Sequence, residues 1–205
     1  MKNRDYKIFR QDQFYHVFNR GNNRGITFID DQDYQSFLNR IRILLNISSA
    51  KSLGIRSRLT SLPANSFSII SYALMPNHYH FFIKQNAEIP IGLFVKKLMT
   101  SYAKYFNIRH DRVGNVFQDI FKAKHVDSDS YFTSLSAYIH NNPENPSIYP
   151  YSSFQEYLNP ENSNNLCNTS YILNYFNGDA ESYKQFVESY GYREYQNIKH
   201  LTLED

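Results

Sequence analysis

The chain has 205 residues and a net charge of +3, and it is 41% hydrophobic and 17% aromatic, with 18 Tyr, 16 Phe and no Trp. This length fits one domain, or one domain with an appendage. A single cysteine, Cys167, excludes an internal disulfide and a four-thiolate zinc site and suits a reducing compartment. We expect a soluble, cytoplasmic protein without a membrane partner, because neither a signal-type apolar segment nor a run of roughly 20 apolar residues occurs.

The first half of the chain alternates between strand and helix patterns. Residues 14–20 (FYHVFNR) predict a strand, and the GNNRG that follows predicts a turn. From Asp30, acidic residues precede apolar residues at helical spacing up to Leu45, which predicts a helix. Residues 46–66, rich in Ser, Arg and Lys, predict a loop.

The next elements follow with shorter connections. Residues 67–75 and about 78–85 predict two strands separated only by Pro-Asn, as in a hairpin. An amphipathic pattern predicts a helix over 90–110, and residues 115–126 (NVFQDIFKAKHV) predict another strand. A helix is expected from about residue 128 to Pro143, where proline stops it.

This order, β-α-β-β-α-β and then a helix, predicts an α+β fold: a ferredoxin-like split βαβ sandwich with an antiparallel sheet. Three prolines at 143, 146 and 150 mark a boundary. We therefore expect a catalytic domain over 1–143. An acidic, Tyr-rich, helical C-terminal extension over 144–205 would pack on it or follow it.

Two histidines in the motif MPNHYH (75–80) lie within a stretch that otherwise reads as a buried strand. Residues two apart in a strand point to the same face, about 7 Å apart, so His78 and His80 can converge on one metal ion while Tyr79 faces the core. The alternative is a pair of solvent-facing or internally bonded histidines. Two imidazoles leave the coordination sphere open, which favours Lewis-acid chemistry over a closed structural zinc site.

The segment SAYIHNNP (136–143) supplies a phenol and an amide on one helix face. Tyr138 and Asn142 are one turn apart, which places their Cβ atoms about 6 Å from each other. An amide oxygen can ligate a metal while the phenol points at the same centre. The competing interpretations are packing for the tyrosine and helix termination for the asparagine, whose backbone Pro143 pushes out of the α region.

Basic residues are concentrated in the first two-thirds of the chain. Residues 1–126 carry 19 Lys and Arg against 8 Asp and Glu, whereas residues 127–205 carry 3 against 11. This division favours a polyanionic partner for the N-terminal part, although ordinary solvated faces would also account for it. The candidate nucleic-acid contacts are Arg20, Arg24, Lys96, Lys97, Lys104, Lys122 and Lys124.

Five segments in register resemble one protein family: HVFNRGNNR, YALMPNHYHFFI, GNVFQDIFKAKHV, YIHNNP and YPYSSFQEYL. Together they are similar to the HUH-type single-tyrosine transposases, and most of all to the branch of REP-associated tyrosine transposases. The likeness extends from about residue 14 to residue 158, and the tail YFNGDAESYKQFVESY also looks familial. The 46–66 loop is longer than this family predicts.

The resemblance implies a ferredoxin-like fold, Mg²⁺ or Mn²⁺ as cofactor, and single-stranded or hairpin DNA as partner. It implies that His78, His80 and Asn142 are metal ligands and that Tyr138 is the nucleophile. The implied reaction cleaves and rejoins single-stranded DNA through a 5′-phosphotyrosine, at hairpin-bearing repeat ends. Family members occur as dimers and as monomers.

Other interpretations remain open. The chain could be a non-catalytic, domesticated DNA-binding protein of the same fold. A histidine-based phosphoesterase would need a third alternating histidine, and position 82 is Phe. Relaxases and replication initiators also pair HUH with tyrosine, but they are usually larger. Tyr102, Tyr105 and Tyr131 are rival nucleophiles, the first two on an apolar helix stripe.

Overall fold

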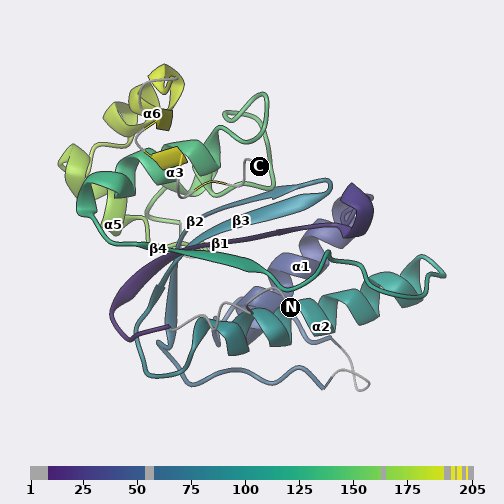
Figure 1. The fold of residues 1–205 in the computed structure, drawn as a ribbon. Coiled ribbons are helices and arrows are strands. Elements are labelled where there is room, and N and C mark those ends of the chain that lie inside the picture. Colours follow the sequence, from purple (N-terminus) through teal and green to yellow (C-terminus); the bar gives the residue numbers. More distant parts are fainter. Residues whose placement is uncertain are drawn as a thin grey trace, which may run out of the picture.

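A computed structural model describes residues 9–53, 58–162, 165–191, 195–196, 198–199 and 202. A four-stranded sheet separates two layers of helices (Figure 1). Helices α1 and α2 cover one face, and α3 and the C-terminal helices α5 and α6 cover the other. No helix in the described ranges is both long and apolar enough to cross a membrane.

The sheet has the strand order β2-β3-β1-β4, and each neighbouring pair is antiparallel. Its strands are β1 (Gln13–Arg20), β2 (Phe67–Met75), β3 (His78–Gln85) and β4 (Lys122–Val126). The helices between them are α1 (Asp31–Leu44) and α2 (Ile91–Arg109). This arrangement confirms the predicted α+β fold with a split βαβ topology.

Helices α1 and α2 form because their apolar residues recur on one face. Asp30 caps α1, and its side chain accepts a hydrogen bond from the backbone N–H of Asp33. Both apolar stripes are buried against the sheet, together with Tyr79 of β3. The expectations for these two helices are therefore confirmed.

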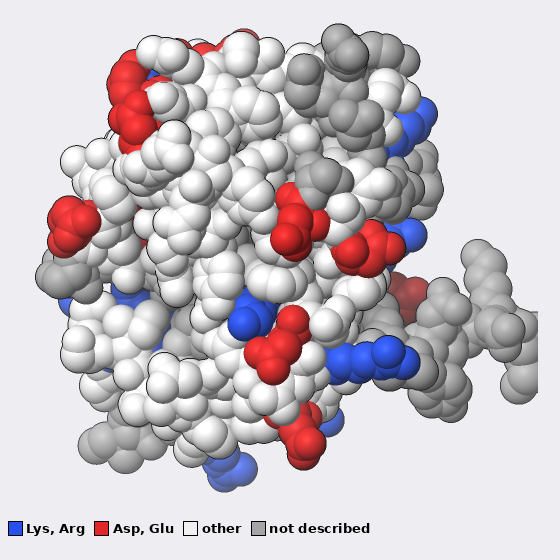
Figure 2. All heavy atoms as spheres, turned by 90° about the vertical axis from the view of Figure 1, so that its left-hand side faces the viewer, with Lys and Arg blue, Asp and Glu red and all other residues white. Residues whose placement is uncertain are grey.

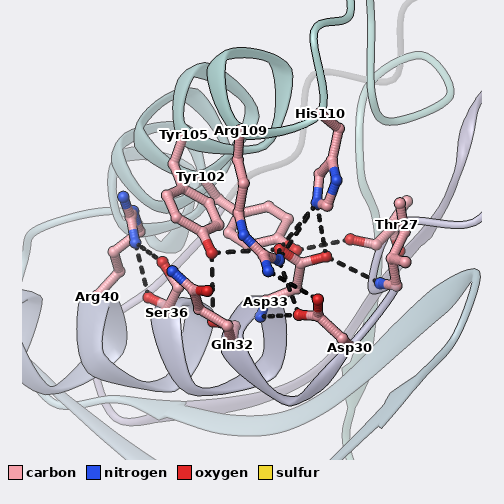
Figure 3. A network of polar contacts seen from close by, with 11 residues as sticks. Thr27, Asp30, Gln32, Asp33, Ser36, Arg40, Tyr102, Tyr105, Arg109 and His110 are labelled. Carbon is pink, nitrogen blue, oxygen red and sulfur yellow. Dashed lines mark hydrogen bonds and ion pairs between the residues drawn. The ribbon is translucent and has the colours of Figure 1, made fainter.

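An ionic network joins the start of α1 to the end of α2 (Figure 3). The buried Asp33 carboxylate lies 2.7 Å from Arg109 Nη1 and 2.9 Å from His110 Nε2, and it accepts the Ile29 N–H at 2.9 Å. Asp30 pairs with Arg109 Nη2 at 2.7 Å. The network also holds the chain that leaves the GNNRG turn.

The C-terminal part packs on the opposite face of the sheet. Helix α3 (Phe132–His140) and α6 (Ala180–Ser189) bury a second apolar cluster with β2 and β3. The other elements there are η2 (Asp129–Tyr131), α4 (Phe154–Leu158), α5 (Ser170–Leu173) and η3 (Asn174–Phe176). In its described part, the chain after residue 143 contains helices that pack on this face of the sheet. Positions 163–164, 192–194, 197, 200–201 and 203–205 lie outside the described residues.

This extension also covers the edge strand β2. The Asn168 N–H donates to the Ile69 carbonyl at 2.8 Å, and the Leu74 N–H donates to the Tyr151 carbonyl at 2.9 Å. A free edge strand would offer these groups to another chain. The tail therefore satisfies part of the hydrogen bonding along the free edge of β2.

Two expectations about element length were wrong. The strand predicted over 115–126 is regular only from Lys122, because Asp119 adopts a left-handed φ of 48°, which breaks an extended run. Before it, Phe117 makes only an isolated bridge to Gly21. The helix expected from residue 128 begins as the 3₁₀ turn η2 and becomes α-helical at Phe132. Residues 46–53 and 58–66 contain no helix or strand, as expected for a loop, and 54–57 lie outside the described part.

Candidate active site

His78 and His80 lie on β3 and face helix α3, while Tyr79 between them points into the α1/α2 core. His80 and Tyr79 are both fully buried, and His78 is partly exposed. The two imidazole rings are 5.1 Å apart and nearly perpendicular. The alternation predicted from the sequence is therefore present.

Asn142 reaches this histidine pair from the end of α3. Its Oδ1 lies 3.3 Å from His78 Nε2, and its Nδ2 donates to the Tyr138 carbonyl at 3.0 Å. The helix ends at His140, so Asn142 lies just beyond it, as the proline at 143 requires. Residues 64 positions apart in the sequence thus meet at one point.

The Tyr138 ring completes the cluster. It is nearly perpendicular to the His80 ring, with centroids 5.8 Å apart and an interplanar angle of 88°. Tyr195, from the C-terminal segment, lies on another side of Tyr138 at a centroid distance of 6.0 Å. The structure thus brings His78, His80, Tyr138 and Asn142 together.

Burial keeps both histidines neutral. Desolvation lowers the pKa of His80 well below its usual value, and the neighbouring His16 and His78 lower it further. Desolvation also lowers the pKa of His78, against the contact with Asn142, which raises it. A neutral imidazole has one N–H and one lone pair, which is the form that binds a metal ion.

The contacts of His78 leave a lone pair that a cation would satisfy. Asn77 Nδ2 donates to the Arg24 carbonyl, which turns Asn77 Oδ1 toward His78 Nδ1 at 2.7 Å. Asn142 likewise presents an oxygen to His78 Nε2. A neutral His78 can donate to only one of these two oxygens. The nitrogen left over faces an oxygen acceptor.

His80 also has a ring nitrogen whose hydrogen bonding is incomplete among the described residues. Its Nδ1 contacts His16, but its buried Nε2 has no hydrogen-bond partner among the described residues. No three His, Cys, Asp or Glu side chains in the described ranges are grouped to hold a metal ion. A third ligand from the described part of the chain would therefore be of another kind, and the Asn142 amide oxygen fits. The donor set accommodates a divalent cation.

Comparisons with known proteins identify a family that part of this chain matches. Residues 60–142 match the family described as IS200-like transposases. The resemblance to this transposase family is confirmed. No curated protein matches the chain significantly. A DNA-processing role of the transposase type is the function that the family match supports.

Two solved structures are similar to this chain. One is the structure of the REP-associated tyrosine transposase bound to a REP hairpin, with a TM-score of 0.55 and 15% identity over 76% of this chain and 85% of that chain. The other is a candidate transposase from Deinococcus radiodurans, with a TM-score of 0.40 and 17% identity over 69% of this chain and 97% of that chain. The first supports the transposase fold.

Three of the basic residues proposed from the sequence border the cluster of this transposase-like chain. Arg20 is directly opposite His78 in the β1–β3 register. Lys122 is opposite Phe18, which is opposite His80, so Lys122 lies two strand spacings, roughly 10 Å, from His80 on the same face. Lys124 is opposite His16.

The remaining basic candidates lie elsewhere. Arg24 is in the 3₁₀ turn η1 (Asn22–Arg24), where its carbonyl holds Asn77. Lys96, Lys97 and Lys104 line a groove on α2, in the layer on the far side of the sheet from the histidines. They cannot contact a strand bound at Tyr138 without that strand passing around the sheet.

The sequence-level charge division does not produce a single patch on the face drawn in Figure 2. Acidic and basic side chains there are dispersed among uncharged ones.

The rival tyrosines are engaged elsewhere. The buried Tyr102 hydroxyl donates to the Thr27 carbonyl at 2.6 Å, and Tyr105 contacts the Gln32 carbonyl and Asp33 (Figure 3). Both lie across the sheet from the histidines. Tyr131 packs at the edge of the apolar cluster under α3.

His16, a neighbour of this cluster, was not among the residues selected from the sequence. It lies within the strand FYHVFNR, fully buried, with Nε2 2.9 Å from His80 Nδ1. The available signal was a polar residue at a position that alternates with Phe14 and Phe18 in a buried strand.

Proposed function

We propose that this chain cleaves and rejoins single-stranded DNA by transesterification, with Tyr138 as the nucleophile and His78, His80 and Asn142 as ligands of Mg²⁺ or Mn²⁺. One observation carries the proposal. His78, His80 and the Asn142 amide oxygen converge beside the Tyr138 ring, and the buried Nε2 of His80 has no hydrogen-bond partner among the described residues.

The chemistry follows from the phenol. The Tyr138 oxygen attacks a backbone phosphorus, so that a Tyr O–P bond forms and the P–O3′ bond breaks. The phenolic proton leaves to solvent, and the departing 3′ oxygen takes one up. The phosphodiester energy is kept in the 5′-phosphotyrosine, so a second 3′-OH can reverse the step and join a new strand without ATP.

The protein's own residues orient this reaction. Asn142 is tied to the Tyr138 carbonyl, so the amide and the phenol move together with the end of α3. His78, His80 and Asn142 would hold a divalent ion, which would supply Lewis-acid charge at the scissile phosphate. The choice of Mg²⁺ or Mn²⁺ follows the family resemblance, since imidazole ligands alone favour later transition metals.

The partner is single-stranded or hairpin-bearing DNA. The REP hairpin held by the similar transposase structure supports this choice, as do Arg20, Lys122 and Lys124 beside the site. A strand that crosses the β1 and β4 end of the sheet would bring its phosphates past these three cations to Tyr138.

The test mixes the full chain, a labelled hairpin-bearing oligonucleotide and Mn²⁺, and separates the products on a denaturing gel. We expect a protein–DNA band that chelator removes and that Tyr138→Phe lacks. Tyr102→Phe, which removes a hydroxyl on the other face, should retain the band. An adduct in Tyr138→Phe would show another nucleophile, and DNA binding without any adduct in the wild type would favour a non-catalytic role.

A further inference from the structure

His16 is in buried contact with His80, and the proposed reaction gives His16 no role. The two rings are nearly parallel, at 18°, with centroids 5.2 Å apart, and both side chains are fully buried. They come from neighbouring strands: His80 is opposite Phe18 and His16 is opposite Phe82. The pair is therefore a diagonal one across β1 and β3, fixed by the strand register.

A hydrogen bond between two imidazole nitrogens needs one N–H and one lone pair. If His16 Nε2 carried the hydrogen, the single N–H of His80 would lie on Nε2, buried without a partner among the described residues. A buried donor left unpaired is costly in every state of the protein. If His80 Nδ1 carries the hydrogen, the atom left without a partner is instead the Nε2 lone pair.

We propose that His16 is a positioning residue that accepts the Nδ1–H of His80 and thereby keeps the Nε2 lone pair of His80 directed at the proposed metal position. This inference rests on the proposed function. Metal-ligating histidines commonly donate their second ring N–H to a neighbouring acceptor, which fixes tautomer and ring orientation.

The second histidine has the same kind of support from a different residue. Asn77 presents its amide oxygen to His78 Nδ1, which leaves Nε2 for the metal side. The neighbouring acceptors of the two ligands are thus unlike: an amide from the adjacent position for His78, and an imidazole from another strand for His80. Both leave Nε2 as the nitrogen on the side of the proposed metal position.

A packing role and a positioning role predict different behaviour of two variants. His16→Leu retains an apolar side chain of comparable bulk but has no acceptor. His16→Gln has an amide oxygen that can accept the His80 Nδ1–H. If His16 only fills space, both variants should bind metal as the wild type does.

The experiment measures Mn²⁺ binding to the full chain without DNA, by electron paramagnetic resonance of the free ion. We expect His16→Leu to weaken binding by about 10- to 100-fold, the usual effect of losing an outer-shell partner. His16→Gln should bind close to wild type. His125→Gln, which changes an exposed imidazole on β4, is the control and should have no effect.

Long-range ¹H–¹⁵N spectra of the metal-free protein give the tautomer directly. We expect His80 to carry its proton on Nδ1 in the wild type and in His16→Gln, and to lose that preference in His16→Leu. If His16→Leu bound Mn²⁺ with the same affinity as the wild type, the inference would be overturned and the proposed function would stand. If His16→Leu fails to fold, a wild-type His80 protonated on Nε2 would still overturn it. Absence of Mn²⁺ binding in the wild type would instead reject the metal site itself.

Discussion

Each face of the sheet buries a cluster of polar side chains, and the Asp33 cluster and the His80 cluster differ in how far their hydrogen bonds are satisfied. On the α1/α2 face, the Asp33 carboxylate has an arginine, a histidine and a backbone N–H as partners. On the α3 face, His80 Nε2 has none among the described residues, and His78 faces two oxygens with one N–H. The first arrangement is complete without a ligand, whereas the second is not.

His140, another buried histidine on the α3 side of the sheet, sharpens this contrast. His140 is as buried as His80, and burial lowers its pKa to about 3. Its Nδ1 contacts the Tyr183 hydroxyl and its Nε2 contacts Ser153 Oγ, each at 2.8 Å. Burial and neutrality therefore do not distinguish a functional histidine. A ring nitrogen without a hydrogen-bond partner in the described part of the chain, such as His80 Nε2, distinguishes it when the lone pairs of other side chains converge on the same point.

The largest expected difference between these two histidines concerns metal affinity. His80→Ala should weaken Mn²⁺ binding by more than about 100-fold, because loss of a ligand exceeds the loss caused by outer-shell changes. His140→Gln should leave Mn²⁺ affinity unchanged and lower only stability. Isothermal titration of both variants with Mn²⁺ checks this. Equal affinity in His80→Ala and the wild type would remove the contrast.

On the α1/α2 face, a substitution of the buried Asp33 should lower the free energy of unfolding without changing Mn²⁺ affinity. Asp33→Asn removes a buried charge from its partners, and we expect a loss of about 3 kcal/mol in the free energy of unfolding. Mn²⁺ affinity should not change, since the sheet lies between this network and His80. Urea unfolding measures the first quantity and metal titration the second; a parallel loss of metal binding would show that the two faces are coupled.

Much of the fold follows from patterns within the sequence. The strands 67–75 and 78–85 and both helices of the α1/α2 layer were predicted within one or two residues, because strong periodicity fixes them. The start of β4 was missed, since a left-handed residue at Asp119 leaves no mark in a hydrophobicity pattern. The family likeness supplied the roles proposed for Tyr138 and Asn142, and the fold places both residues beside His78 and His80.

What the sequence could not supply depends on strand pairing. His16 meets His80 only because β1 and β3 pair in one particular register, and a shift of one residue would place the imidazole on the other face. Alternation within a single strand does not define that register. The separation of Lys96, Lys97 and Lys104 from the site has the same origin, since only the topology shows which face each helix covers.

A smaller difference in unfolding free energy should separate a buried tyrosine whose hydroxyl is hydrogen-bonded from one whose hydroxyl is not. Tyr183→Phe removes the hydroxyl between His140 Nδ1 and Ser136 Oγ and should cost about 1–2 kcal/mol of unfolding free energy. Tyr79→Phe removes a buried hydroxyl without a partner in the described part of the chain, so stability should stay the same or rise. Urea unfolding of both variants checks this. A loss in Tyr79→Phe as large as in Tyr183→Phe would show that its hydroxyl has a partner.

The smallest effect is the acid dependence of the α1/α2 network. The hydrogen bond from Arg109 lowers the pKa of Asp30 from 3.8 to about 2. Because the folded state binds this proton less readily than the unfolded state, the contribution of Asp30 is present above about pH 4 and is lost as the pH falls toward 2. Asp30→Asn should therefore flatten the fall in unfolding free energy between these values, measured by urea unfolding at several pH values. Asp12→Asn, which removes an exposed carboxylate paired with Lys84, is the matched control. If the two variants and the wild type share one slope, Arg109 does not hold Asp30 in its charged form.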